Sequence, residues 1–407
     1  MKISRIFLPS TVLPALKLLN DGEDSSSKSD RLINHYMVKY AIPGLSITVT
    51  KNGKTLYSKG FGYSNVETDT PCTNDSVFRI ASISKSITAI IAGKLIDAKK
   101  LDIDKNINEY IKDFPEKIYE GEKVSITSKH LLTHMSGVRH YTKKNEKKEK
   151  DDDLESEFLL NKPFNNVSHA LELFKDDELL SKPGEKFNYT THGFTLLSRV
   201  IEEASGKDFS DLVHKLFNEL GMNSSYIDNN KNIIHNRVQF YRRNKSHELE
   251  NCPEVDNSYK IAGGGMLSTS EDLTKFGNAL LKSFQCYDEC NNGCDVISNS
   301  TISKIWEPQV KTHEKIVPFF YCLGWSHVPF EKNNCPENTF CKNGYWYHTG
   351  AAVGCSSVLL IKPTTTRNQK QEIYEYPQGI CVAILTNVQD CYNGITNLAL
   401  DVAESFS

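Results

Sequence analysis

Strand patterns lie near both ends of this 407-residue chain, and few lie between them. Residues 45–49 alternate apolar and polar side chains up to the turn Asn52-Gly53, and a return run follows at residues 56–63, which predicts a β-hairpin. Near the other end, residues 357–361 and 380–385 are apolar runs of the length of a buried strand. The simplest arrangement is one antiparallel sheet to which both ends of the chain contribute.

Helical patterns fill most of the middle of the chain. We expect helices at residues 128–132, 171–180, 196–204 and 209–220, and a last one at residues 395–406. The predicted fold class is therefore α/β, of the α+β kind, with an antiparallel sheet flanked by helices and a mainly helical subdomain inserted into it.

Two structural units are expected. Residues 31–96 and 260–407 form the α/β sheet domain, and residues 97–259 form the mainly helical subdomain. Within the helical part, residues 143–157 are nearly all charged, so they bury too little apolar surface to fold alone. We interpret them as an exposed charged loop; a solvated helix face is the alternative, and a binding arm is less favoured.

Residues 1–30 are interpreted as a targeting segment and a linker. The first twenty carry Lys2, Arg5 and Lys17 and contain no acid, which is typical of a targeting segment, with a disordered leader as the alternative. Residues 21–30 are rich in serine and charge and are predicted to be the linker.

Composition argues against several classes of function. With 39% hydrophobic residues the chain can bury a full core, and its formal net charge of -3 leaves no basic excess for phosphates, so no nucleic-acid partner is expected. No apolar run approaches the roughly 20 residues that span a bilayer, so the protein is expected to be soluble or to contact a membrane peripherally.

Eleven cysteines are many for a cytosolic enzyme and favour a compartment that permits disulfides. Six of them crowd one region: Cys286, Cys290, Cys294, Cys322, Cys335 and Cys341. The spacing of the first three is not a standard zinc pattern, and no histidine follows at finger spacing. Free thiols or disulfides are favoured over structural zinc, and no metal ion or other cofactor is expected.

Ser82 and Lys85 form a Ser-x-x-Lys pair at the start of a helical pattern. Residues three apart on a helix share one face, so the lysine amine can reach the hydroxyl and act as its base. Residues 77–80 form an extended lead-in, so Ser82 begins the helix, where free N–H groups favour a developing negative charge. Residues 25–28 repeat the pattern in a polar stretch, and the simpler interpretation of such a pair is a capping serine with a solvated lysine.

Tyr189 follows the turn Pro183-Gly184 and precedes two threonines that can cap a helix. A phenol there can hydrogen-bond the serine oxygen and relay its proton to a leaving group. The simpler interpretation is an ordinary half-buried tyrosine.

His348-Thr349-Gly350 ends an aromatic run and precedes Ala351, as an edge strand beside a substrate would. Thr349 can donate to a substrate oxygen, Gly350 permits close backbone approach, and His348 supplies a charge that is lost as pH rises past about 6.5. The simpler interpretation is a strand-end histidine without a ligand. Among the remaining residues, His134 is expected to be a hydrogen-bonded turn residue.

Taken together, the three motifs resemble those of the serine β-lactamase and penicillin-binding protein superfamily, in its class C-like branch. Longer runs at residues 114–125, 140–141 and 259–268 resemble the mitochondrial serine β-lactamase-like proteins of animals, and the likeness extends over roughly residues 42–406.

The resemblance implies roles for the motif residues. Ser82 would be the nucleophile, Lys85 its base or base partner, and Tyr189 the second proton-transfer group, with the choice between Lys85 and Tyr189 as general base left open. The backbone N–H groups of Ser82 and Ala351 would form the oxyanion hole, and His348 with Thr349 would orient the substrate.

The same resemblance implies a mitochondrial serine peptidase that forms an acyl-enzyme on peptide or amide bonds, assembles into homo-oligomers or filaments and influences lipid metabolism. A filament-forming protein with a vestigial site, an esterase, a D-amino-acid peptidase or a weak β-lactamase are the alternatives, and secretion is the alternative location. Thr191 and His348 stand where bacterial relatives carry asparagine and lysine, which weakens the case for antibiotic hydrolysis.

Overall fold

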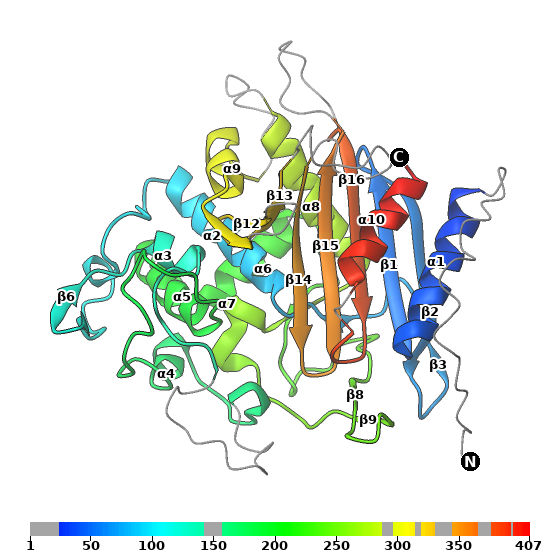
Figure 1. The fold of residues 1–407 in the computed structure, drawn as a ribbon, viewed down its shortest axis with the longest axis horizontal. Helices are drawn as coiled ribbons and strands as arrows, with labels where there is room; N and C mark the ends of the chain where they lie inside the picture. The colour runs from blue at the N-terminus through cyan, green and yellow to red at the C-terminus, as the bar shows by residue number, and fades with distance from the viewer. Residues whose placement is uncertain are drawn as a thin grey trace.

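An antiparallel sheet built from both ends of the chain lies at the centre of the molecule (Figure 1). The computed structural model describes residues 24–141, 157–286, 296–313, 319–329, 344–364, 376–391 and 394–407. Within these ranges the strands of the main sheet pair in the order β11 (Val310–His313), β12 (Phe319–Tyr321), β13 (Ser326–Val328), β14 (Tyr345–Ala352), β15 (Cys355–Pro363), β16 (Gly379–Thr386), β1 (Gly44–Lys51), β2 (Lys54–Asn65) and β3 (Thr70–Pro71).

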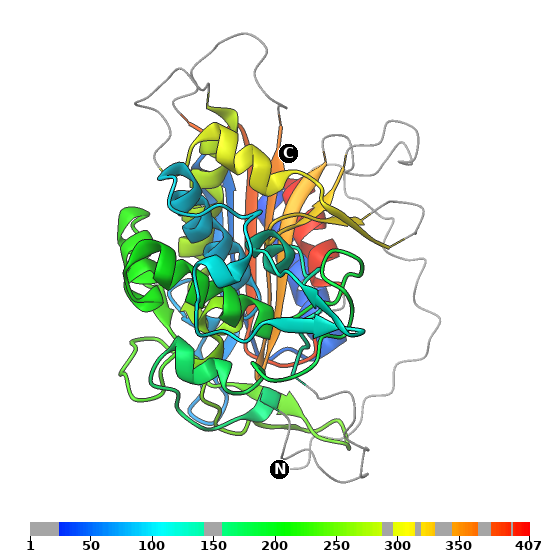
Figure 2. The ribbon, with the colours of Figure 1, turned by 90° about the vertical axis from the view of Figure 1, so that its left-hand side faces the viewer.

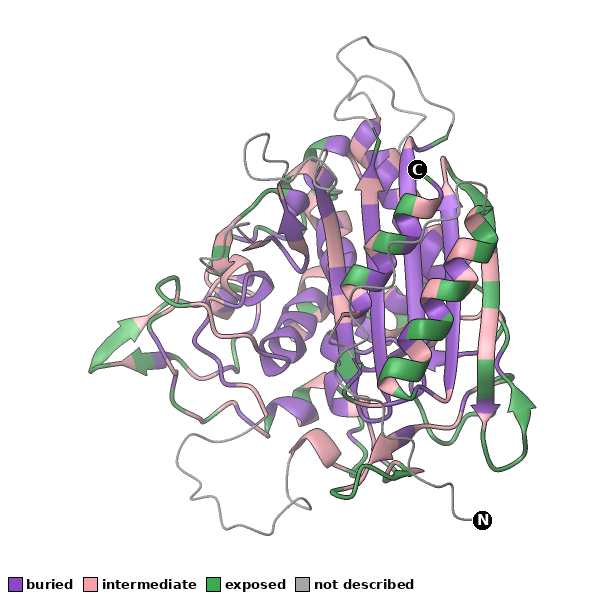
Figure 3. Ribbon diagram, turned by 45° about the vertical axis from the view of Figure 1, so that its right-hand side comes forward, coloured by how far each residue is buried: buried purple, intermediate pink, exposed green. Residues whose placement is uncertain are grey.

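Helices cover both faces of this sheet. On one face lie α1 (Ser25–Tyr40) and α10 (Ile395–Ser405), whose outward sides are exposed while their inner sides are buried against the strands (Figure 3). On the other face lie α8 (Ser270–Gln285), α9 (Asn299–Trp306) and the buried helix α2 (Ile83–Asp97).

Most of the rest of the described chain lies beside the sheet, next to α2, while residues 241–251 lie at the end of the sheet near Val388 (Figures 1 and 2). Its helices are α3 (Ser128–Leu132), α4 (Val167–Leu171), α5 (His192–Ser205), α6 (Phe209–Glu219) and α7 (Ile261–Gly264), with 3-10 turns η2 (Ile107–Glu109), η3 (Glu157–Leu159) and η4 (Ser258–Lys260). Its short strands are β4 (Phe78–Arg79), β5 (Lys117–Tyr119), β6 (Glu122–Val124), β7 (Tyr226–Ile227), β8 (Tyr241–Arg243), β9 (Leu249–Asn251) and β10 (Met266–Ser268).

Strand β1 shows why the sheet is buried on both faces. Leu45 and Val49 belong to the apolar core beneath α1 and α10. The alternate side chains Ser46 and Thr48 face α8, where their hydroxyl oxygens lie 2.9 Å and 2.8 Å from Oγ of Ser270. Because side chains alternate across a strand, an alternating sequence here marks one apolar core and one hydrogen-bonded face.

Most of the elements expected from the sequence are present. The hairpin is β1 and β2, the two C-terminal apolar runs are β15 and β16, and the last helix is α10. The predicted antiparallel sheet flanked by helices is therefore confirmed.

The linker predicted at residues 21–30 is wrong for its described part, because helix α1 already begins at Ser25. Asp24 caps this helix by accepting hydrogen bonds from the backbone N–H groups of Ser26 at 2.9 Å and Ser27 at 3.1 Å. The serines are thus a capped first turn, and the apolar face that docks the helix begins at Leu32 and Ile33. The serine-rich composition of this stretch did not indicate that a helix begins here.

The helix predicted at residues 171–180 is also wrong. Helix α4 ends at Leu171. Beyond it, side chains from other segments donate hydrogen bonds to carbonyl groups that a longer helix would use. Arg139 donates to the carbonyl of Leu173 at 2.8 Å, and Lys117 donates to that of Asp177 at 2.9 Å. Long-range contacts therefore override the local helical pattern.

Most of the charged loop predicted at residues 143–157 lies outside the described residues. Its last member, Glu157, is described and is an anchored ion-pair partner: its carboxylate accepts from Arg139 at 2.7 Å and 2.8 Å and lies 2.8 Å from Nε2 of His192. The exposed-loop interpretation is therefore wrong for Glu157.

The described part of the chain contains no helix long and apolar enough to cross a membrane. In the same residues no group of three or more His, Cys, Asp or Glu side chains is placed to hold a metal ion. Buried cysteines of the core, such as Cys72, Cys355 and Cys381, are free thiols.

Candidate active site

Ser82 occupies the N-cap of helix α2, one short turn after strand β4. The preceding residue, Ala81, has a positive φ of 49°, an uncommon conformation for a residue with a side chain. The backbone therefore turns sharply at this point and presents Ser82, which remains half-buried, at the start of the helix. The side chain of Ser82 makes no capping hydrogen bond, so its hydroxyl is not committed to the helix terminus.

Lys85 points back along α2 to Ser82. Its side chain is 0% exposed, and its Nζ lies 3.0 Å from Oγ of Ser82, 2.6 Å from the carbonyl oxygen of Gly263 and 3.3 Å from Oγ1 of Thr191. Burial, helped by the nearby charge of Lys260, holds the pKa of Lys85 well below its ordinary value. Burial thus favours the neutral amine more than in an ordinary lysine. In that form the amine can donate to Gly263 and Thr191 and has one lone pair that can accept the hydroxyl proton of Ser82.

Tyr189 lies over the same amine, with Nζ of Lys85 4.8 Å from the centre of its ring. Burial raises the pKa of Tyr189 above its ordinary value, and a side-chain hydrogen bond with Ser82 acts in the opposite direction. The phenol therefore keeps its proton at neutral pH. It is suited to pass a proton on from Ser82 rather than to remove one first.

His134 holds the loop of Tyr189 from three directions. Its carbonyl accepts from the backbone N–H of Asn188 at 2.8 Å, its Nδ1 accepts from that of Thr190 at 3.1 Å, and its ring lies 4.2 Å from the ring of Tyr189, centre to centre. The turn itself needs the positive φ of 60° at His134. The expectation of a hydrogen-bonded turn residue is confirmed.

A chain of hydrogen bonds runs from this loop to strand β14 through Tyr321 on β12. Because Nδ1 of His134 accepts from Thr190, its Nε2 carries the hydrogen and donates to Oη of Tyr321 at 3.1 Å. Tyr321 in turn donates to Nε2 of His348 at 3.1 Å, and Nδ1 of His348 donates to the carbonyl of Thr349 at 2.7 Å. When both histidines are neutral, each hydrogen bond in this chain has one donor and one acceptor, without conflict between neighbouring bonds.

The structure corrects the charge expected of His348. Burial, followed by the nearby Lys85, lowers the pKa of His348 to about 3. The side chain is therefore neutral throughout the physiological range, so it cannot hold a substrate carboxylate by a charge that titrates near pH 6.5. In the structure, the side chain of His348 completes the hydrogen-bond chain that runs through Tyr321.

Strand β14 passes close to the turn that carries Ser82. A Cβ on Gly350 would lie 2.4 Å from the carbonyl oxygen of Ile80 and 3.0 Å from the side chain of Ala81, so only glycine fits here. The space that glycine provides is occupied by the protein's own backbone. The contact brings β14, with half-buried Thr349 and exposed Ala351 on either side of Gly350, against the turn that precedes Ser82.

Sequence reasoning missed Tyr321 and Lys260 as parts of this region. Both are single residues distant in sequence from Ser82 and reach it through tertiary contacts, so no local spacing marks them. The simple motifs, in contrast, did identify side chains that the fold brings together: Ser82, Lys85 and Tyr189.

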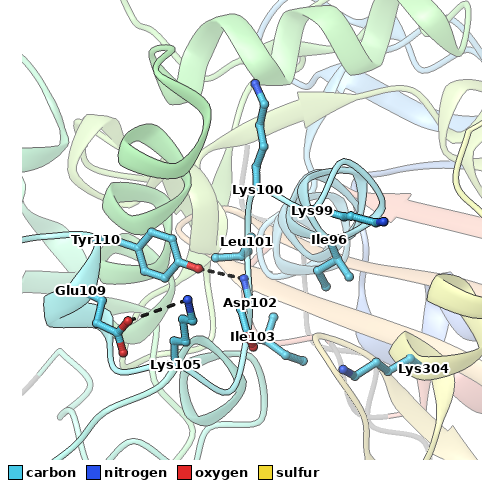
Figure 4. Close-up of a pocket in the computed structure, with 10 residues that line it drawn as sticks. All are labelled: Ile96, Lys99, Lys100, Leu101, Asp102, Ile103, Lys105, Glu109, Tyr110 and Lys304. Atoms are coloured by element: carbon cyan, nitrogen blue, oxygen red, sulfur yellow. Dashed lines mark hydrogen bonds and ion pairs between the residues drawn. The ribbon is translucent and has the colours of Figure 1, made fainter.

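The molecule also has a surface pocket of about 550 Å³ at the opposite end of α2 (Figure 4). Lys99, Lys100 and Lys304 are among its lining residues, and the hydroxyl of Tyr110 accepts from the backbone N–H of Asp102 there at 2.8 Å. Because α2 rises about 1.5 Å per residue, this pocket lies on the order of 20 Å from Ser82. It is separate from the candidate active site.

Comparison with known proteins agrees with this geometry. The family model described as Beta-lactamase matches residues 29–395. The human protein "Serine beta-lactamase-like protein LACTB, mitochondrial" is 36% identical over an alignment that covers 92% of this chain and 78% of the relative.

Two solved structures show the same fold. The octameric penicillin-binding protein homologue from Pyrococcus abyssi has a TM-score of 0.69 and 26% identity, covering 92% of this chain and 75% of its own. A class C beta-lactamase has a TM-score of 0.68 and 19% identity, covering 93% of this chain and 96% of its own. With its Ser-x-x-Lys helix, tyrosine loop and glycine-containing strand in place, the chain belongs to the beta-lactamase family.

Proposed function

We propose that the protein is a serine hydrolase that cleaves peptide or amide bonds through an acyl-enzyme on Ser82. The observation that carries this proposal is the environment of Lys85: a buried amine, 3.0 Å from the serine oxygen, whose two other partners are hydrogen-bond acceptors. Such an amine is a base poised to receive the hydroxyl proton.

The proposed reaction has two steps. In the first, Lys85 takes the proton of Ser82, Oγ attacks the substrate carbonyl carbon, and Tyr189 delivers a proton to the leaving amine as the carbon–nitrogen bond breaks. In the second, water attacks the acyl-enzyme and gives a proton to Tyr189, while Ser82 takes back the proton held by Lys85 as the acid leaves. The positive end of α2 favours the negative charge that develops on the carbonyl oxygen, with the backbone N–H groups of Ser82 and Ala351 as the proposed donors.

The curated relatives supply the remaining parts of the proposal. The relatives from mouse and human are named as mitochondrial proteins, which supports a mitochondrial location. The penicillin-binding protein homologue from Pyrococcus abyssi is described as octameric, which supports homo-oligomers. Filament assembly and an influence on lipid metabolism rest on the family resemblance alone.

Turnover tests the enzymatic proposal against its alternatives. We expect the protein to release fluorophore from members of a peptide-amide library. Cleavage of aryl esters without any peptide amide would favour an esterase. Absence of turnover on peptides, esters and a chromogenic β-lactam, in a protein that electron microscopy shows to assemble, would contradict the proposal in favour of a filament-forming protein.

Tyr321→Phe is expected to lower kcat about ten-fold or more while KM changes little. The variant keeps the ring but leaves Nε2 of His134 and Nε2 of His348 without their partner, so the loop of Tyr189 and strand β14 lose their link. Steady-state kinetics with a neutral substrate measures the effect.

Tyr110→Phe is the matched control, because it removes a hydroxyl that accepts a backbone hydrogen bond far from Ser82. Equal kinetics for the two variants would show that Tyr321 does not position the site.

A further inference from the structure

The surface pocket at the end of α2 brings together lysines from different parts of the chain (Figure 4). Lys99 and Lys100 follow the end of the helix, Lys105 belongs to the loop before η2, and Lys304 lies on α9. Lys304 joins the other three only through the fold. The grouping is therefore a property of the folded chain and not of one lysine-rich run.

A second pocket, of about 230 Å³, lies between α2 and α6 and shares Lys100 with the first. It adds Lys94 on α2, Lys207 in the turn before α6, and Lys215 on α6. The two pockets together are lined by seven lysines, with Lys100 counted once, and by three acids. Because the whole chain carries a formal net charge of -3, this face departs from the overall charge and favours an anionic ligand.

Two of the three acids are already engaged by lysines of the pockets. Glu219 lies 2.9 Å from Nζ of Lys94 and 3.7 Å from Nζ of Lys215. Glu109 lies 3.9 Å from Nζ of Lys105. These acids balance the lysines that they contact and leave the charge of the remaining lysines uncompensated.

Lys99, Lys100 and Lys207 make no ion pair with any acid among the residues that the structure describes. The third acid, Asp102, uses its carboxylate to accept from the backbone N–H of Asp104 at 3.1 Å. Positive charge without a partner thus remains at the end of α2, where Lys99 and Lys100 are both exposed. A ligand with several negative charges gains most from such a surface.

The floor of the first pocket is apolar. Leu101 and Ile103 are buried there, and Ile96 is half-buried. The chain itself caps this end of α2, since the backbone N–H of Lys99 donates to the carbonyl of Ile96 at 2.9 Å. The first pocket therefore offers cations around an apolar floor.

We propose that the first pocket binds the phosphate groups of a small organic polyphosphate, with Lys99 and Lys100 as anchors. The two side chains extend in different directions (Figure 4), so a chain of phosphate groups gains more from them than a single phosphate does. The apolar floor suits a ring or another apolar part of the same molecule, and the volume of about 550 Å³ is in the range of small-molecule sites. This binding does not require Ser82, so the proposal stands apart from the serine-hydrolase function.

Calorimetry with ATP and AMP, in buffer without divalent cations, tests the proposal, because the two probes share a nucleoside and differ in their phosphate groups. We expect ATP to bind at least about ten-fold more tightly than AMP, and its affinity to fall as the salt concentration is raised. Lys99→Met/Lys100→Met should weaken ATP binding at least about ten-fold, whereas Lys99→Arg/Lys100→Arg should keep most of the affinity.

Lys231→Met/Lys245→Met is the matched control, because both lysines are exposed and line neither pocket. This variant should bind ATP as the wild-type protein does. Ser82→Ala should also bind ATP unchanged, which makes the result independent of any hydrolysis. Equal affinity for ATP and AMP, or an equal loss in the two Lys→Met double variants, would overturn the proposal.

A lipid headgroup can present the same phosphate chemistry, and vesicle flotation distinguishes the two sources. The vesicles contain phosphatidylcholine with or without a phosphorylated phosphoinositide, and we expect the wild-type protein to float with neither. Flotation that needs the phosphoinositide and is lost in Lys99→Met/Lys100→Met, without ATP binding in solution, would overturn the soluble ligand and assign the pocket to a headgroup.

Discussion

Ser82→Ala is expected to lower kcat/KM by at least about 10⁴-fold on any substrate that the wild-type protein hydrolyses. The substitution removes the oxygen that attacks the carbonyl and leaves Lys85 with no proton to take. Binding groups and backbone N–H donors alone give only residual catalysis. Initial rates with a fluorogenic peptide amide measure the loss.

The fold should survive this substitution. The side chain of Ser82 makes no capping hydrogen bond, so helix α2 loses no cap when the hydroxyl is removed. The matched control is Ser25→Ala, because Ser25 and Lys28 repeat the Ser-x-x-Lys spacing on α1, far from Tyr189. Full turnover by Ser82→Ala, or an equal loss in Ser25→Ala, would contradict the mechanism.

Lys85→Met is expected to lower kcat/KM by about 10²- to 10⁴-fold, the usual contribution of a general base. Methionine fills a similar space without an amine, so the hydroxyl of Ser82 keeps its proton. Because the lysine is fully buried, replacing it by an apolar side chain should keep or raise the melting temperature. Lys28→Met is the control and should leave the rate unchanged.

The role of Lys85 as base also predicts the direction in which kcat/KM changes with pH. The pKa of Lys85 lies below its ordinary value, so the base is neutral and active above that pKa and is lost as pH falls through it. With neutral substrates kcat/KM should therefore rise with pH to a plateau. His348, whose pKa is near 3, should add no step between pH 5.5 and 8.

An alternative assignment makes Tyr189 the general base, and Lys85→Arg distinguishes the two. Arginine stays charged at every pH used, so it cannot accept the proton. It would still supply the positive charge that a tyrosine base needs. Near-complete loss of activity in Lys85→Arg across the pH range identifies Lys85 as the base. Activity of this variant that returns at high pH would assign the role to Tyr189.

Local sequence patterns predicted the hairpin of the sheet and the contact between Ser82 and Lys85 because both depend on short-range spacing. The hairpin of β1 and β2 is marked by alternation around Asn52-Gly53, and the pairing of Ser82 with Lys85 follows from one helical turn. These features require no knowledge of distant contacts.

Errors arose where tertiary contacts decide the outcome. The neutral state of His348 depends on burial and on the nearby charge of Lys85, which belongs to helix α2. Lys260 gains its aromatic surroundings from η3 and the segment around Tyr141. The helix expected near residue 175 is replaced by turns because Arg139 and Lys117 bind its carbonyls.

The most direct test of the central claim is intact-mass spectrometry after incubation with a small fluorophosphonate, which reacts with activated serines. We expect one adduct on wild-type protein, mapped to Ser82, none on Ser82→Ala, and slow labelling of Lys85→Met. No adduct on folded wild-type protein, or an adduct that persists in Ser82→Ala, would contradict the claim that Lys85 activates Ser82.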